Sequence, residues 1–499
     1  MELLNNLILG FGVALTPINM AYCFIGVLVG TLVGVLPGLG PLATMAMLLP
    51  ITFNMAPVTA LIMLAGIYYG AQYGGSTTAI LVNLPGESSS VVTCIDGYQM
   101  ARQGRAGAAL AISALGSFFA GTVSTMLIAG FAPPLADLAL KFGPSAYFSL
   151  MVLGLVSAIV LASGSIAKAI AMVLLGILLG LVGTDVNSGV ARFTFGISEL
   201  SDGVGFVIVA MGVFGFTEVI VSLELNEKRE VFTKKVTGLW LTKDEFKAAA
   251  PAVLRGTMLG SMLGILPGGG ALLSSFAAYS FEKKISKNPS KFGKGAIEGV
   301  AAPESANNAG AQTSFIPLLT LGIPSNPVMA LMMGAMMIHN IQPGPQIVIN
   351  QPELFWGMIA SMWVGNLMLV VFNLPLIGMW VKLLSVPYRF LFPAILLFCG
   401  IGIYTLSYNT FDIYLAVLFG FLGYLFVKLE CEAAPLMLGF ILCPMMEESL
   451  RRALLISRGD PAVFLTNPIS LCMLIAATAL LGIVIMPAVR RKREDVFVE

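Results

Sequence analysis

The chain has 499 residues, of which 57% are hydrophobic and only 11% are charged, and its formal net charge is +1. This composition excludes an ordinary soluble domain and, with no strongly basic balance, indicates no nucleic-acid partner. At roughly 20 residues per crossing, the long uncharged runs predict an all-α polytopic membrane protein with about 10–14 membrane segments.

The first half opens with a glycine ladder: Gly26, Gly30, Gly34, Gly38 and Gly40 lie in an apolar run ending in Leu-Pro-Gly-Leu-Gly. A four-residue glycine step leaves one helix face bare, so another backbone can pack closely against it. The proline removes a backbone donor and the last glycines permit positive φ, which predicts a broken helix. Broken helices expose main-chain groups to a solute, so Gly38 and Gly40 are candidate substrate-binding residues.

A polar stretch at 68–90 follows within apolar sequence and ends in the proline turn Leu84-Pro85-Gly86. Its hydroxyls and amides are costly against lipid, so we interpret them as lining a solute site. Helix capping and bonds between helices are the alternative. The candidate binding residues here are Ser76, Thr77, Thr78, Asn83, Pro85 and Gly86.

A basic linker at 226–255 separates a first membrane repeat (1–225) from a second (256–470). The positive-inside rule places this linker in the cytoplasm, together with the lysines of 283–294 and the arginines of 451–458. Residues 471–499 are predicted to be a terminal helix and a basic cytoplasmic tail.

The second repeat begins with another ladder, and Gly268 and Gly270 are its candidate binding residues. Its glycines are Gly256, Gly260, Gly264, Gly268 and Gly270. Segment 256–281 has basic flanks and a break near its middle, so each half has about eleven or twelve residues, too few to cross. We predict a re-entrant hairpin entered from the cytoplasm. The counterpart near 26–51 has no basic flank, which predicts two inverted-topology repeats. A single re-entrant loop with a chance match elsewhere is the alternative.

The second polar stretch, 302–327, matches the first in its spacing. Pro85 follows Pro37 by 48 residues and Pro324 follows Pro267 by 57. The extra length fits an inserted loop that carries the lysines of 283–294, named the lysine loop here. The candidate binding residues of this stretch are Asn307, Asn308, Thr313, Ser314, Pro324 and Ser325.

Acids near apolar segments are candidates for ion coupling, since a charge at a helix centre costs at least roughly 2.5–3.5 kcal/mol. Among Glu304, Asp185, Glu218 and Asp412, the best placed is Glu304, in the flank of the second polar stretch. An interfacial, solvated position is the alternative for each. The single histidine, His339, is expected at a helix end.

Enzyme chemistry finds no support, so no catalytic residue is assigned. No phosphate-binding Gly-x-x-x-x-Gly-Lys-Ser/Thr loop is present, and one histidine excludes a His-rich metal site. The six cysteines are scattered without a paired motif. No metal site and no cofactor are predicted beyond a coupling H⁺ or Na⁺.

The motifs as a set resemble the large membrane subunit of tripartite tricarboxylate transporters. The similar segments are GVLPGLGP (34–41), 69–86, DGYQMARQGRAGAAL (96–110), GILPGGG (264–270), 279–309 and LGIPSNP (321–327). The resemblance spans most of 20–345. By it, Gly38, Gly40, Gly268 and Gly270 match the family's breaks, and Asn307 and Asn308 match its paired asparagines. Ser325 and Asn326 stand where the resemblance implies a glycine-rich turn.

The resemblance implies a three-part importer of the bacterial inner membrane. A periplasmic solute-binding protein and a small membrane subunit of about four helices would accompany this chain. The expected function is import of a tricarboxylate or other carboxylate, driven by an H⁺ or Na⁺ gradient. The alternatives are a carboxylate-selective channel without ion coupling and a membrane assembly subunit without transport.

Overall fold

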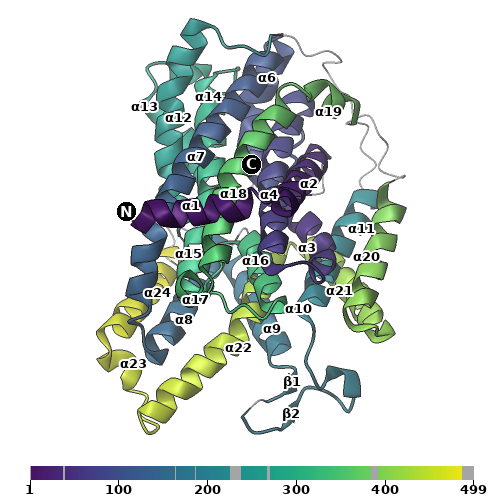
Figure 1. Ribbon diagram of the computed structural model, residues 1–499, viewed down its shortest axis with the longest axis vertical. Coiled ribbons are helices and arrows are strands. Elements are labelled where there is room, and N and C mark those ends of the chain that lie inside the picture. Colours follow the sequence, from purple (N-terminus) through teal and green to yellow (C-terminus); the bar gives the residue numbers. More distant parts are fainter. Residues whose placement is uncertain are drawn as a thin grey trace.

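The computed structural model describes residues 2–36, 40–162, 165–185, 187–224, 238–266, 270–383 and 391–485. These residues are overwhelmingly helical (Figure 1). Within them, five helices are long and apolar enough to cross a membrane: α2 (Pro17–Val35), α7 (Ala106–Ala139), α18 (Pro352–Asn373), α21 (Thr410–Lys428) and α22 (Ala433–Ile456). The predicted all-α polytopic class is confirmed, apart from two short antiparallel strands, β1 (Gly183–Thr184) and β2 (Ala191–Arg192).

The other elements before the linker are, in chain order, α1 (Glu2–Ala14), α3 (Pro41–Thr52), α4 (Pro57–Val82), η1 (Ser88–Ser90), α5 (Val91–Thr93), η2 (Cys94–Tyr98), α6 (Gln99–Arg102), α8 (Pro144–Leu161), α9 (Ile166–Gly180), η3 (Ser198–Leu200), α10 (Phe206–Ala210), η4 (Met211–Phe216) and α11 (Thr217–Glu224). Both η2 and η4 are π-helical turns between helical segments.

The other elements after it are α12 (Lys243–Gly264), α13 (Gly270–Ile285), η5 (Pro289–Lys291), α14 (Glu298–Thr313), α15 (Phe315–Leu321), α16 (Pro327–Ile338), α17 (Gln346–Asn350), α19 (Ile377–Leu383), α20 (Leu391–Ser407), α23 (Val463–Thr466) and α24 (Pro468–Ile485). Figure 1 shows α12, α13 and α14 grouped at one end of the long axis, with β1 and β2 at the other.

Helices α4 and α14 form the centre of the molecule. Every residue of α4 from Thr59 to Leu81 is buried, and so is every residue of α14 after Glu298. A helix buried on all sides normally carries apolar residues. These two carry both predicted polar stretches, so their polar side chains must find partners inside the protein.

The glycine ladder of α2 packs directly on the backbone of α4. A Cβ added at a ladder glycine would collide with a carbonyl oxygen of α4, so only glycine permits this approach. The colliding pairs are Gly26 with Met63, Gly30 with Ile67, and Gly34 with Ala71. The predicted bare face is therefore in contact at three successive glycines, over about two helical turns.

Helix α12 packs on α14 in the same way. The colliding pairs are Gly256 with Ala302, Gly260 with Ala306, and Gly264 with Gly310. Partners lie 37 residues apart in the first half (63 − 26) and 46 in the second (302 − 256). The nine-residue difference equals the difference between the two proline spacings, 57 − 48. Both halves thus use one contact register, while their opposite orientation and re-entrant insertion stay predictions.

Two details of the breaks differ from expectation. The first arm of the second hairpin has 22 residues rather than eleven or twelve, because α12 begins inside the basic linker. Thr242 caps this helix and Glu245 returns the bond, forming a capping box. At the breaks, Gly270 has φ +49°, whereas Gly40 has φ −64° and acts as the extended N-cap of α3. Of Gly40 and Gly270, only Gly270 therefore adopts a positive φ.

Candidate functional site

Glu304 lies at the centre of the buried polar residues and is fully inaccessible to solvent. Its Oε2 accepts hydrogen bonds from Ser76 Oγ at 2.6 Å and Ser113 Oγ at 3.0 Å, and its Oε1 accepts one from Thr93 Oγ1. The acid comes from α14 and its donors come from α4, α5 and α7. The carboxylate therefore joins the two halves through hydroxyl groups.

Glu87 is a second buried acid beside this cluster. Its Oε1 accepts hydrogen bonds from Ser89 Oγ and from Asn307 Nδ2, the latter at 3.3 Å. Ser89 Oγ also lies 3.3 Å from Gln72 Oε1. Across the described residues, no lysine or arginine forms an ion pair with Glu87 or Glu304. The core thus holds two carboxylates with only neutral donors around them.

The paired asparagines of α14 face different partners. Asn308 Nδ2 donates to Ser117 Oγ of α7 at 2.7 Å and to the Glu304 carbonyl oxygen at 3.1 Å. Asn307 reaches Glu87 instead, and its Oδ1 has no hydrogen-bond partner among the described residues although it is buried. Asn308 therefore has a partner in each half, whereas Asn307 keeps one free acceptor.

Hydroxyls near the two breaks bind the last carbonyls of the hairpin arms. Thr78 Oγ1 donates to Val35 O at 2.8 Å, and Ser314 Oγ lies 3.4 Å from Gly264 O. Both contacts satisfy helix-end acceptors that otherwise lack partners. These residues therefore stabilise the ends of α2 and α12 next to the polar cluster.

The turns after α4 and α15 have equivalent geometry. Asn83 (φ 60°) and Gly322 (φ 71°) are left-handed caps, and Glu87 and Asn326 each stand four residues later. Asn326 caps α16 by accepting from the Met329 backbone N at 3.0 Å. Its Nδ2 also donates to the Ser314 hydroxyl at 3.0 Å. Glu87 is thus the first-half counterpart of Asn326.

The remaining candidates fall into three groups. The first group is buried and contains Ser325, Pro324, Gly86, Thr77 and Thr313. Ser325 Oγ donates to Ser314 O at 3.2 Å. The hydroxyls of Thr77 and Thr313 donate to carbonyl oxygens of their own helices. Gly40 and Pro85 are half-buried, and the Asn83 cap is exposed and outside the cluster. Gly38 and Gly268 lie outside the described residues.

The residues that sequence reasoning missed are Glu87, Thr93 and Ser113. Glu87 could have been found, because it stands in the first polar stretch at the spacing that Asn326 has in the second. Thr93 and Ser113 carry no local signal. They reach Glu304 through the packing of α5 and α7 on α14.

The other acids have different roles. Asp185 lies in the loop before β2, where the Ser188 hydroxyl, the Asn187 backbone N–H and Arg451 hold its pKa below the usual range. Asp185 therefore stabilises this loop and its contact with α22. Glu218 and Asp412 lie on α11 and α21. His339 ends α16, as expected.

Asp96 of η2 holds the lysine loop of the second half. It is fully buried, and its Oδ1 accepts from the backbone N–H groups of Gly293, Gly295 and Ala296 at 2.9, 2.8 and 2.8 Å. Its Oδ2 accepts from Tyr279 OH at 2.9 Å. This second contact between the halves lies beside the site and was not predicted.

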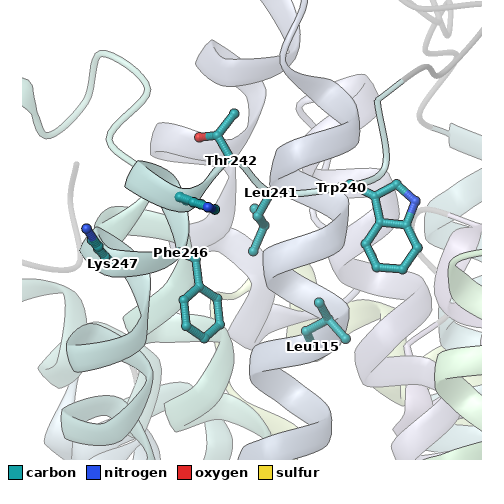
Figure 2. A pocket seen from close by; sticks show the side chains of 7 residues that line it. Leu115, Trp240, Leu241, Thr242, Phe246 and Lys247 are labelled. Atoms are coloured by element: carbon teal, nitrogen blue, oxygen red, sulfur yellow. The ribbon is translucent and has the colours of Figure 1, made fainter.

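Two cavities lie away from the polar cluster. One of about 440 Å³ is lined by Leu115 of α7 and by residues 240–243, 246 and 247, and Figure 2 shows Phe246 and Leu241 beside Leu115. The other, of about 420 Å³, is lined by residues around Arg105, Glu245 and the lysine loop. Neither includes a residue of the cluster. Glu304 and Asn307 are both 0% exposed.

Comparison with known proteins agrees with the motifs. The family model described as the tripartite tricarboxylate transporter TctA family matches residues 20–438. An uncharacterized 52.8 kDa protein in the TAR-I ttuC' 3' region of Agrobacterium vitis is 62% identical over the whole chain and 99% of its own length. A protein in the TAR-II ttuC' 3' region of the same organism is 60% identical over 240 residues, 48% of this chain and 99% of its own. No solved structure matches the chain. Since the family match covers most of the sequence, the protein belongs to the tripartite tricarboxylate transporter TctA family.

Proposed function

We propose that this chain is the translocation subunit that imports a carboxylate, a tricarboxylate or another, across the bacterial inner membrane. The observation that carries the proposal is the buried polar cluster shared by the two halves, in which Asn307 contacts Glu87 and Glu304 contacts Ser76. Polar groups of this kind inside membrane-spanning helices are typical of solute and ion paths.

The donors of the cluster suit an anionic solute. Hydroxyl and amide groups can bind carboxylate oxygens once the helices move, and the starts of α3 and α13 supply partial positive charge at the breaks. A periplasmic binding protein would deliver the solute, and a small membrane subunit of about four helices would complete the complex, as in the family.

The two buried acids support coupling to H⁺ or Na⁺, with Glu304 as the residue predicted from sequence. Two uncompensated carboxylates repel an incoming anion, and a bound cation removes part of this repulsion. Binding of the cation would then favour binding of the anionic solute, so that uptake of the two is linked.

The test is uptake of labelled carboxylates by proteoliposomes that contain all three components. We expect accumulation against a gradient, abolished when ΔpH or ΔNa⁺ is collapsed. A channel would equilibrate the solute without accumulating it. If Asn307→Ala and Gly268→Leu left uptake unchanged, the chain would be an assembly subunit and the proposal would be wrong.

A further inference from the structure

The two buried acids differ in how their oxygens are satisfied. Glu304 receives hydroxyl donors on both carboxylate oxygens. The side-chain donors to Glu87, from Ser89 and Asn307, both reach Oε1, and the Ser90 backbone N–H faces the Glu87 side chain in a capping box. A carboxylate bound by hydroxyls on both sides is already a satisfied anion. Glu87 is therefore the better placed of the two to take an additional ligand.

An unpaired polar atom lies beside Glu87. Asn307 Oδ1 has no hydrogen-bond partner among the described residues, although Asn307 is 0% exposed. The same side chain contacts Glu87 directly. Buried polar groups without partners are rare and call for an explanation, of which an absent ion is one.

We propose that Glu87, Asn307 and Ser89 bind the coupling cation as a desolvated Na⁺. The proposal rests on the function proposed above and assigns its ion site. The carboxylate, the Asn307 amide oxygen and the Ser89 hydroxyl supply oxygen ligands, which hard cations prefer. Glu87 comes from the first half and Asn307 from the second, so a bound ion bridges both.

The Asn307 amide provides the response to the ion. In the present arrangement its Nδ2 donates to Glu87 Oε1 at 3.3 Å. Amide oxygen and nitrogen have nearly the same shape, so rotation of the amide exchanges them without a change in packing. With Oδ1 toward Glu87, two acceptors face each other, and either a cation between them or a proton on Glu87 makes this stable.

The charges around Glu87 favour the binding of a cation. When no cation is bound, they disfavour the binding of an anionic solute. The titratable groups near Glu87 are Glu304 of α14 and Tyr68 of α4. Among the described residues, neither acid forms an ion pair with a basic side chain. Sodium at Glu87 therefore lowers the negative charge where the solute carboxylate must enter, so Na⁺ raises the affinity for the solute.

The ion site is tested with the purified full chain and NaCl, against choline chloride at equal ionic strength. We expect a saturable rise in Tm with Na⁺ that is lost in Glu87→Gln and kept in Glu353→Gln, an exposed acid at the start of α18. Asn307→Ala should raise the half-saturating Na⁺ concentration about tenfold, through loss of one ligand. This variant keeps the test decisive if Glu87→Gln does not fold.

Proteoliposome uptake separates this site from the transport function. Carboxylate uptake driven by ΔpH alone, with no Na⁺ dependence, overturns the sodium site and leaves the function intact. An unchanged Na⁺ response in Glu87→Gln also overturns it. A Na⁺ response that depends on Glu87, in a complex that accumulates no carboxylate, supports the site and refutes the proposed function.

Discussion

Glu304 shows how a carboxylate is held in this protein without a basic partner. Three hydroxyls, from Ser76, Thr93 and Ser113, surround it, and each comes from a different helix. Hydrogen bonds to a charged acceptor contribute about 1.5–3 kcal/mol each, roughly twice a neutral bond. The acid therefore acts as a junction that positions α4, α5 and α7 around α14.

We predict that Glu304→Gln destabilises the protein by about 1–3 kcal/mol, because an amide has one acceptor oxygen and leaves a hydroxyl without its partner. The measurement is thermal unfolding in detergent of Glu304→Gln, Ser113→Ala and the double variant. The coupling energy between the two sites should be about 0.5–3 kcal/mol. Additive effects would contradict direct contact, and Glu353→Gln is the control without a buried partner.

At the scale of single residues, the sequence identified the polar side chains better than their roles. Ser76, Asn307, Asn308 and Glu304 meet as expected, because polar groups in fully buried helices can only face one another. Asn83 does not join them, since its place in the chain is a left-handed cap. Whether a hydroxyl binds a solute or a helix end depends on packing that local sequence does not encode.

Pairs of helices joined by glycine ladders are the building elements of both halves. Each pair, α2 with α4 and α12 with α14, has backbone in contact with backbone at three successive glycines. Such close approach gains dispersion contacts along the whole seam, which is the main attraction available between helices in lipid.

We predict that Gly30→Ala destabilises the protein by about 1–3 kcal/mol, because the new methyl group meets the carbonyl of Ile67, which cannot move as a side chain would. Gly130→Ala, on α7 with open space around it, is the matched control and should unfold at or above the wild-type temperature. Thermal unfolding measures both. Equal behaviour of the two variants would show that the seam is not tightly packed.

The ladders were predictable because their four-residue step is visible in the sequence, but the helices on which they pack were not. The extent of the arms was not predictable either. Charge in Lys243 and Lys247 masks the first two turns of α12, whose helix is recognised instead by the Thr242 capping box. Hydropathy alone therefore starts this helix only after its polar first turns.

The crossing of successive helices gives the molecule a definite sidedness. Arg105 and Gln103 contact the backbone of Gly295 and Lys294, so the start of α7 and the lysine loop share one side. Counting α7, α8 and α9 as three crossings predicts that the loop holding Asp185 lies on the opposite side. Helices α10 to α11 return the chain to the basic linker.

This count separates basic residues that the positive-inside rule groups together. Arg451 pairs with Asp185 at 2.9 Å, which by the same count predicts that Arg451 lies on the side opposite the lysine loop. It also pairs with Glu447, and Arg452 pairs with Glu448. The positive-inside rule counts lysines and arginines whatever acids lie beside them, so this prediction departs from the rule. The predicted cytoplasmic tail after Ile485 lies outside the described residues.

We predict that an impermeant thiol reagent added outside labels Arg458→Cys and not Ser290→Cys, each in a cysteine-free background. Both positions are exposed, so burial does not decide the result. Permeabilised cells, in which both should react, provide the control. Labelling of both from the same side would contradict the three crossings and restore the assignment by charge alone.

Asp96 limits where a transport cycle can open the molecule. Its four hydrogen bonds join η2 to Tyr279 and to the lysine loop, and each bond to a buried charge contributes about 1.5–3 kcal/mol. A conformational step that ruptured all four would carry that barrier at every turnover, and each 1.4 kcal/mol slows a step about tenfold. Rapid cycling therefore requires η2, Tyr279 and the lysine loop to move together as one rigid unit. The relative movement of a transport cycle must then occur elsewhere in the protein.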